Sequence, residues 1–186
     1  MRKLKKYTPT RFMAKTSHYD KDAADFAVMF IDLSAIPRAT WAGKPFELID
    51  WQEQIIRDLF GVLKPNGYRQ FNTAYIEIPK KQGKSELAAA VALLLLCGDG
   101  EERAEVYGCA ADRNQAKIVF DVAVDMVRFC PALSKRVKIL ESQKKITYLP
   151  TNHPISTVGR RGKQARLQYP RRDFRRAAYP AQPETL

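Results

Sequence analysis

Gly83, Lys84 and Ser85 have the residue types and the order that suit phosphate chemistry. They follow the strand-like run AYIEIP and precede the apolar run LAAAVALLLLC, so they lie at a turn between a strand and a helix. Such a turn directs backbone N–H groups and the positive end of the helix toward one point, where a phosphate binds. Here Gly83 would let the backbone approach the phosphates, Lys84 would neutralise their charge, and the Ser85 hydroxyl would ligate Mg²⁺.

The loop departs from the common phosphate-binding pattern at one position. The first glycine of G-x-x-x-x-G-K-[ST] falls at Ile78. The alternative is a chance GKS on a solvated turn, but its place between a strand and a long apolar helix favours a nucleotide site. The predicted phosphate-binding residues are Pro79, Lys80, Lys81, Gln82, Gly83, Lys84 and Ser85, with ATP and Mg²⁺ as cofactors.

The surrounding sequence alternates between helical and strand-like segments. Helical spacing of apolar residues predicts helices at Asp22–Leu33, Leu48–Leu63 (with Asp50 as its N-cap), Ala88–Cys97 and from Asp112 to just before Pro131. Strands are predicted at Thr73–Pro79, Ala104–Ala110, Val137–Leu140 and Ile146–Leu149, the last two forming a hairpin. This order predicts an α/β fold like that of P-loop NTPases, with a mainly parallel sheet flanked by helices.

Composition and charge restrict the class of protein. The 186 residues suit one domain, and the longest apolar run, Leu87 to Cys97, is too short to span a bilayer. The basic N-terminus lacks the apolar stretch of a secretory signal, so we expect a cytoplasmic location. The net charge is +12, and residues 153–186 hold eight Lys/Arg against two acids. A polyanionic partner such as nucleic acid fits this charge. We expect the three cysteines to be reduced.

Several runs of this sequence together resemble one protein family. IEIPKKQGKSELAAA resembles the deviant phosphate loop of the large terminase subunit of tailed bacteriophages, the ATPase that packages DNA. WAGKPFELIDWQEQIIRDLFG precedes it and CGDGEERAEVYGCAADRNQAKIVFDVAVDMVRFCPAL follows it, in the family's order. The resemblance covers roughly Tyr7 to Pro150.

The resemblance implies roles for further residues. Gln52, beside Trp51, resembles the glutamine that recognises adenine, and an amide suits adenine because it both donates and accepts; the alternative is a surface glutamine. Lys80 matches a basic residue that stabilises the γ-phosphate, or is simply solvated. Arg113 and Gln115 face DNA or, as we favour, cap and solvate a helix.

The family also implies partners and a location. These are double-stranded phage DNA, the small terminase subunit and the portal, with no membrane, in the cytoplasm of the bacterial host.

One part that such an ATPase needs does not appear in the sequence. In the family a strand like GVIFDELHAQP supplies an Asp that holds Mg²⁺ through water and a Glu that activates the attacking water. After Glu141 the only acids are Asp173 and Glu184, and neither ends an apolar run. We therefore expect ATP to bind but to be hydrolysed very slowly or not at all.

A sequence that resembles the missing strand is permitted when the codons of the tail are read one nucleotide later. Codons for RLQYPRRDFRRAAYP (166–180), read one nucleotide later, permit GFNIHGVIFDELHTQ, with the Asp and Glu in register with Arg175 and Arg176. Extending back to Ser156 permits VLSADAANKHGF. We therefore expect a frameshift near Pro154–Ser156, in which case the basic tail is an out-of-frame product.

The predicted organisation is an N-terminal arm and helix (1–47), a partial terminase ATPase domain (48–152) and a disordered basic tail (153–186). The chain would then be an N-terminal terminase fragment without the nuclease domain. Two alternatives remain. A helicase-like DNA-dependent ATPase would have to use Asp99, Asp112 or Asp125 as its catalytic acid. A non-enzymatic basic protein would bind DNA through its tail.

Overall fold

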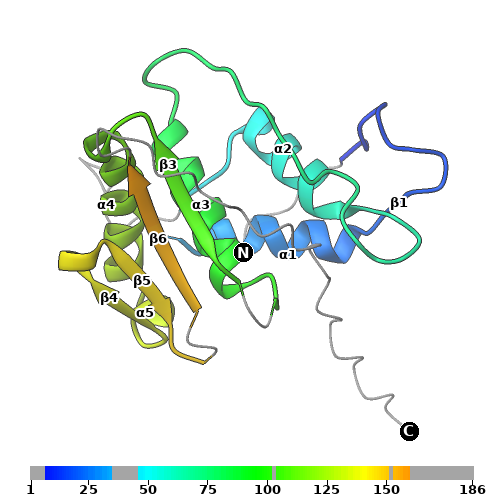
Figure 1. Cartoon of the computed structure of the whole chain (residues 1–186). Coiled ribbons are helices and arrows are strands. Elements are labelled where there is room, and N and C mark those ends of the chain that lie inside the picture. The colour runs from blue at the N-terminus through cyan, green and yellow to red at the C-terminus, as the bar shows by residue number, and fades with distance from the viewer. Residues whose placement is uncertain (1–6, 35–45, 102–103, 151–152, 160–186) are drawn as a thin grey trace, which may run out of the picture.

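The computed structural model describes residues 7–34, 46–101, 104–150 and 153–159 (Figure 1). Six strands, five α-helices and one 3-10 helix occur within these ranges. In chain order they are β1 (His18–Tyr19), α1 (Lys21–Asp32), α2 (Asp50–Gly61), β2 (Val62–Leu63), α3 (Lys84–Cys97), β3 (Val106–Ala110), α4 (Arg113–Phe129), α5 (Pro131–Ser134), β4 (Val137–Leu140), η2 (Glu141–Gln143), β5 (Lys145–Tyr148) and β6 (His153–Gly159). This mixture of helices and strands confirms the predicted α/β class.

The helices begin and end close to where the sequence predicts. The carboxylate of Asp20 accepts a hydrogen bond from the N–H of Ala23 at 2.9 Å and so caps α1. Asp112 caps α4 in the same way, accepting from the N–H groups of Asn114 and Gln115. The prediction that Asp50 caps α2 is wrong, because Asp50 is the first helical residue and Ile49 precedes it.

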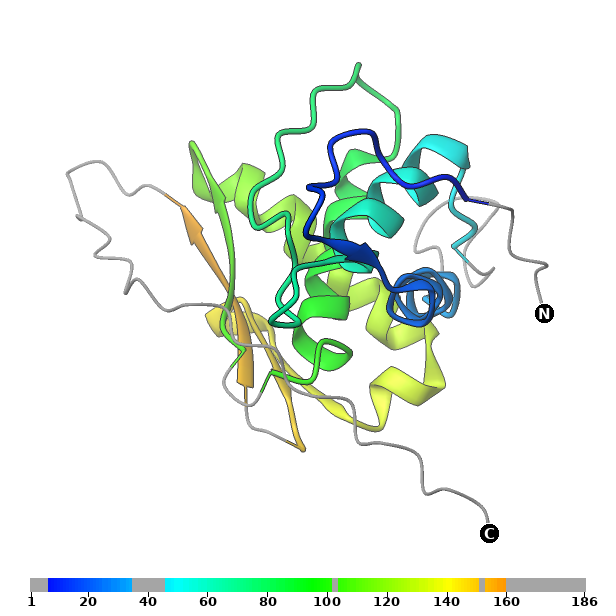
Figure 2. The same ribbon diagram turned by 90° about the vertical axis from the view of Figure 1, so that its right-hand side faces the viewer.

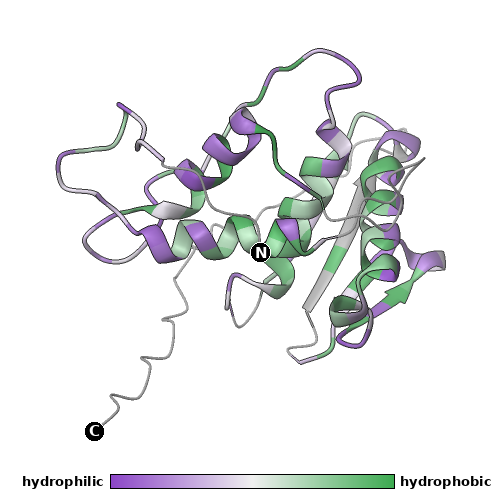
Figure 3. Ribbon diagram, turned by 180° about the vertical axis from the view of Figure 1, so that it is seen from behind, coloured by the Kyte–Doolittle hydropathy of each residue, from purple (hydrophilic) through white to green (hydrophobic). Residues whose placement is uncertain are grey.

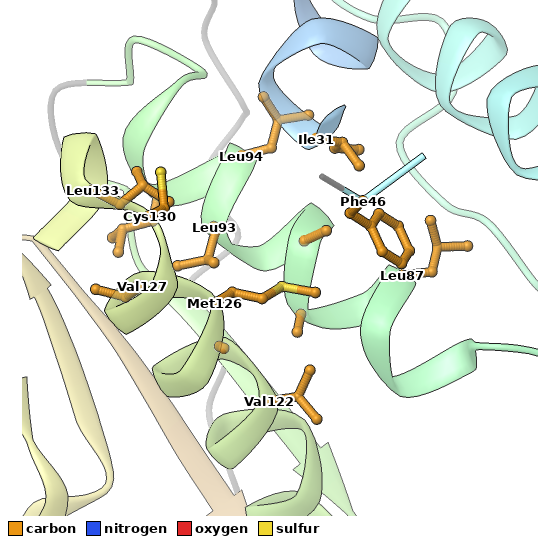
Figure 4. Packing of buried hydrophobic residues seen from close by; sticks show 14 of the residues in the cluster. Ile31, Phe46, Leu87, Leu93, Leu94, Val122, Met126, Val127, Cys130 and Leu133 are labelled. Carbon is orange, nitrogen blue, oxygen red and sulfur yellow. The ribbon is translucent and has the colours of Figure 1, made fainter. Parts of the chain in front are cut away.

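The core lies between α3 and the helices on both sides of it. α3 is apolar around its whole circumference because it contacts α4 on one side and α1 on another. Leu93 of α3 and Met126 of α4 are fully buried, and Phe46 packs beside Leu87 at the N-terminal end of α3 (Figure 4). The helix that follows the predicted phosphate loop is therefore fixed in the core.

The larger sheet has the order β3-β6-β5-β4. β3 and β6 pair in parallel, from Val106 opposite Ile155 to Ala110 opposite Gly159. β4 and β5 form the predicted hairpin, and β5 and β6 are also antiparallel. Within the described ranges the sheet is thus mixed, and the prediction of a mainly parallel sheet is not confirmed. The short connections from β4 to β5 and from β5 to β6 allow only antiparallel pairing.

One face of this sheet is covered by helices. α3 and α4 lie on the same side of the strands (Figure 2), and α4 contacts both β3 and β6. On the other face of β3, Tyr107 is 51% exposed. β3 is also the edge strand within the described part of the chain, so one of its edges and one of its faces are open there.

The segment Thr73–Pro79, predicted as a strand, is extended but unpaired. Residues 72–77 are exposed, and Tyr75 has 88% of its surface in solvent. Hydrophobic and hydrophilic stretches alternate along this loop (Figure 3). Alternation indicates a strand only when a neighbour pairs with it and covers its apolar face, and no described strand lies beside this segment. The strand prediction is therefore wrong within the described residues.

The predicted disordered tail begins too early. Residues His153–Gly159 form β6, which is bonded to strands on both of its edges. Pairing with β3 and β5 organises a segment whose own sequence shows no clear periodicity. Residues 160–186, the rest of the predicted tail, lie outside the described residues. None of the described helices has the length and apolarity needed to cross a membrane.

Candidate functional site

The predicted phosphate loop ends at the N-terminus of α3, on Gly83. Gly83 has φ 71° and ψ 24°, a left-handed conformation that a glycine adopts without strain. No side chain caps α3, whereas Asp20 and Asp112 cap α1 and α4. The N–H groups in the first turn of α3 are therefore left without a side-chain acceptor, at the positive end of the helix.

A second left-handed residue lies two positions earlier. Lys81 has φ 65°, so left-handed residues occur at both 81 and 83. Left-handed residues alternating with ordinary ones turn successive N–H groups toward a common concave side, a nest that suits an anion. Sequence reasoning predicted this freedom for Gly83 and missed it for Lys81, since lysine has no preference for that conformation.

The loop side chains are mostly in solvent. Pro79, Lys80, Lys81, Gln82 and Lys84 are exposed, whereas Gly83 and Ser85 are partly covered. The Lys84 ammonium donates a hydrogen bond to the Ile78 carbonyl at 2.6 Å, which draws the lysine back across the loop. Ile78, at the position where the common pattern has glycine, thus contributes its backbone oxygen. A phosphate would compete with that oxygen for Lys84.

Gln52 lies beside the loop although it precedes Gly83 by 31 positions in the chain. It is 5% exposed, so the alternative of a surface glutamine is wrong. Its Nε2 is 3.5 Å from the point that a Cβ on Gly83 would occupy. Its Oε1 accepts the N–H of Ile49 at 3.2 Å. Trp51, the other predicted adenine contact, is partly buried against the core.

A buried ion cluster that the sequence analysis missed fixes the helix carrying Gln52. Arg57, 2% exposed, donates through Nε to Glu53 at 3.0 Å and through Nη1 to Asp25 of α1 at 2.5 Å. The ring of Tyr7 lies 5.7 Å from its guanidinium carbon. The spacing of Glu53 and Arg57 (i, i+4) indicated an ion pair, but nothing in the sequence indicated that it is buried.

The electrostatics of this cluster favour the ionised forms. Burial raises the pKa of Asp25, but hydrogen bonds from Lys21 and Arg57 outweigh it and hold that pKa below its usual value. Burial lowers the pKa of Arg57, but its hydrogen bonds to Asp25, Tyr19 and Glu53 outweigh burial and raise that pKa. Asp25 and Arg57 are therefore both charged, and they tie α2 to α1.

The three acids that a helicase-like ATPase would have to use already have structural partners. Asp99 pairs with Arg69 at 2.5 Å, and burial raises the pKa of Asp99 in spite of that arginine. Asp112 caps α4, and Asp125 lies 3.9 Å from Arg128. Gln115 is exposed in the first turn of α4, as expected for a solvated residue, whereas the side chain of Arg113 is outside the described part.

No ready-made metal cluster or disulfide occurs among the described residues. No group of three or more His, Cys, Asp or Glu side chains there could hold a metal ion. None of Cys97, Cys109 and Cys130 forms a disulfide in the described part of the chain. Burial raises the pKa of Cys97 to about 12, so this thiol stays protonated and unreactive.

Comparison with known proteins identifies the family. A model of the family "Terminase large subunit, ATPase domain" matches residues 50–158, more than half of the chain. The chain belongs to the terminase large subunit family. The matched range begins at α2, includes the predicted phosphate loop and ends within β6.

The terminase large subunit of Enterobacteria phage HK97 gives a relative and a solved structure. It is 32% identical over 129 residues, which is 69% of this chain and 25% of that protein. The crystal structure of the HK97 large terminase matches with a TM-score of 0.64 and 29% identity, over 76% of this chain and 28% of that one. This terminase chain thus spans about a quarter of its relative's length.

Changing Gly83 to alanine is expected to lower the free energy of unfolding by about 1–2 kcal/mol, because a Cβ is strained at φ 71°. The added Cβ meets only the Gln52 amide, at an ordinary contact distance, so strain accounts for the loss. Urea unfolding would measure it. Gln82→Ala, at an exposed neighbour without positive φ, should change stability by less than about 0.5 kcal/mol. Equal effects of the two changes would contradict the left-handed geometry.

Proposed function

We propose that this chain binds ATP and Mg²⁺ through residues 79–85, as part of the ATPase domain of a DNA-packaging motor. The observation that carries the proposal is the uncapped N-terminus of α3 at the left-handed Gly83, in a chain of the terminase large subunit family. A phosphate supplies the acceptor that the first turn of α3 lacks.

Each charged or polar side chain of the loop then has its own proposed role. Lys84 leaves the Ile78 carbonyl and neutralises the β- and γ-phosphates, Ser85 ligates Mg²⁺ and Lys80 stabilises the γ-phosphate. Trp51 and Gln52 are the proposed contacts for adenine, in keeping with the family resemblance. No step of this scheme needs a side chain from outside the described ranges.

We infer that the chain as it stands hydrolyses ATP very slowly. The sequence holds no adjacent Asp-Glu pair to orient water and Mg²⁺, and Asp99, Asp112 and Asp125 are engaged elsewhere. A frameshift near Pro154–Ser156 accounts for the missing pair and for the basic composition of residues 160–186. The proposed frameshift falls within β6, so both reading frames have to encode a sequence that can form a strand there.

The proposed setting is that of the family. Double-stranded phage DNA, the small terminase subunit and the portal are the proposed partners, in the cytoplasm of the bacterial host. Residues 1–152, outside the basic tail, hold 24 Lys/Arg against 18 Asp/Glu, and this positive charge suits contact with DNA. The HK97 terminase large subunit is about four times longer than the matched segment. The partners are therefore proposed from the family and do not follow from the fold of this chain.

Nucleotide titration of Lys84→Ala tests the proposal. Calorimetry with ATP and Mg²⁺ should show at least about a tenfold weaker affinity, because a charged hydrogen bond to phosphate is lost. Lys135→Ala, an exposed lysine after α5, is the matched control and should bind ATP as the unchanged chain does. Equal affinities for the two variants would refute a phosphate site at this loop.

A further inference from the structure

Gln52 lies where α2 meets the N-terminal end of α3. It is in the first turn of α2, and its side chain crosses from that helix to the loop that opens α3. Apart from Gly83 and its chain neighbours, its Nε2 is the heavy atom that lies within 4 Å of the position that a Cβ on Gly83 would take. The amide therefore lies beside the residue at which the predicted phosphate loop becomes helix.

The rotamer of Gln52 is fixed from its own helix. Oε1 accepts the Ile49 N–H, one of the backbone donors that the start of α2 would otherwise leave unbonded. A side chain that is 5% exposed and tethered at one atom has little freedom left. The tether at Oε1 leaves the amide's donor, Nε2, on the side of Gly83.

The two helices on either side of this contact are themselves fixed. α2 is tied to α1 by Arg57, which pairs with Glu53, one residue after Gln52, and with Asp25. α3 is packed in the core through Leu87, Leu93 and Leu94. The segment between them, residues 72–82, is exposed and has no strand partner within the described ranges. Gln52 thus links α2 to the C-terminal end of this exposed loop.

From these contacts we propose that Gln52 is a positioning residue for the phosphate loop: it holds Gly83, and with it the N–H groups that bind phosphate, in place. The inference rests on the proposed nucleotide site and assigns Gln52 a role that does not depend on the base. Binding of any polyphosphate gains from the brace, because the loop is ordered before the ligand arrives.

Three ligands separate bracing from reading the base. ATP, GTP and inorganic tripolyphosphate, each with Mg²⁺, are titrated against the unchanged chain and Gln52→Met, which keeps the length of the side chain but not its amide. The brace predicts that GTP and tripolyphosphate bind about fivefold more weakly to Gln52→Met, and ATP at least as much, because the loop is then no longer held before the ligand arrives. Gln54→Met, on the exposed side of the same helix, is the matched control and should change none of them.

A second measurement detects the loop without any ligand. Trypsin should cut after Lys80, Lys81 or Lys84 several-fold faster in Gln52→Met than in the unchanged chain, while the urea midpoint of global unfolding should fall only slightly, through loss of the bond to the Ile49 N–H. Where Gln52→Met does not fold, the uncharged Gln52→Leu serves in the same two assays.

The outcomes are distinct. A loss confined to ATP, with tripolyphosphate and trypsin cleavage unchanged, overturns the brace and assigns Gln52 to the base. Failure of the unchanged chain to bind any of the three ligands overturns the proposed nucleotide site, and the role of Gln52 with it.

Discussion

A gene that is read one nucleotide later from codon 156 is expected to give a chain that hydrolyses ATP at least about 100-fold faster than the present one, since a general base contributes about 10²–10⁴-fold. The shifted codons permit GVIFDEL, whose Asp and Glu are in register with Arg175 and Arg176. The carboxylates would hold Mg²⁺ through water and activate the attacking water. Release of phosphate from ATP, compared between the two purified chains, measures the gain.

The sheet has room for the strand that the shifted frame would supply. β3 is at an edge within the described residues and leaves one face uncovered, where Tyr107 is half in solvent. Another strand can pair with the open edge of β3 without displacing β6, β5 or β4. A shift from codon 156 also replaces residues of β6 with VLS, which has the β-branched and apolar character of a strand.

Two control variants test whether the gain in rate comes from the added acids acting on ATP bound at the predicted phosphate loop. Changing the shifted-frame glutamate in register with Arg176 to glutamine should remove the gain in rate while ATP binding persists. Lys84→Ala in the shifted chain should weaken ATP binding as well. DNA whose codons 171–177 do not spell GVIFDEL one base on would disprove the frameshift outright, and a shifted chain no faster than the present one would refute the assigned role of the acids.

The helices of this fold were predictable because each carries its own signal. Asp20 and Asp112 cap α1 and α4, and the apolar stripe of α4 gives its buried residues in the expected order. Strands depend on partners, so the same reasoning failed at Thr73–Pro79, which has a strand-like sequence and no described neighbour. It failed in the opposite direction at His153–Gly159, where pairing forms a strand that the sequence does not suggest.

The site was predictable in its residues but not in its contacts. The motif gave Gly83 and Lys84, and the resemblance gave Gln52, 31 positions earlier. Neither indicated that Lys84 binds the Ile78 carbonyl, or that Gln52 is held at one atom by Ile49 and faces Gly83 with the other. Such contacts depend on how α2 and α3 approach each other, and that approach is fixed by packing and by the buried charges of Arg57, Asp25 and Glu53.

Replacing Arg57 by methionine is expected to lower the free energy of unfolding by about 3–5 kcal/mol. Methionine fills a similar volume but leaves Asp25 and Glu53 as buried charges without their shared cation. That loss is a large part of the about 5–15 kcal/mol that holds a typical domain folded. Urea unfolding followed by circular dichroism would measure it.

Two further variants show whether burial is the cause. Lys117→Met removes a pair with Asp121 of the same i, i+4 spacing, but both side chains are over one-third exposed, so the loss should be below about 1 kcal/mol. Adding Asp25→Asn and Glu53→Gln to Arg57→Met should restore much of the stability, since the two carboxylates that Arg57 neutralised are then uncharged. A loss for Arg57→Met as small as that for Lys117→Met would contradict a buried cluster.

The pH dependence of stability gives the same cluster an independent signature. The pKa of Asp25 is lowered in the folded state, so its contribution is fully present above the pKa of an unfolded aspartate, about 4, and is lost as the pH falls through the lower folded value. The unchanged chain should therefore lose stability more steeply below about pH 4 than Arg57→Met, in which Asp25 no longer has that arginine and gains from protonation. Because α2 carries Gln52 and is tied to α1 by this cluster, acid that protonates Asp25 should also weaken the hold on the phosphate loop.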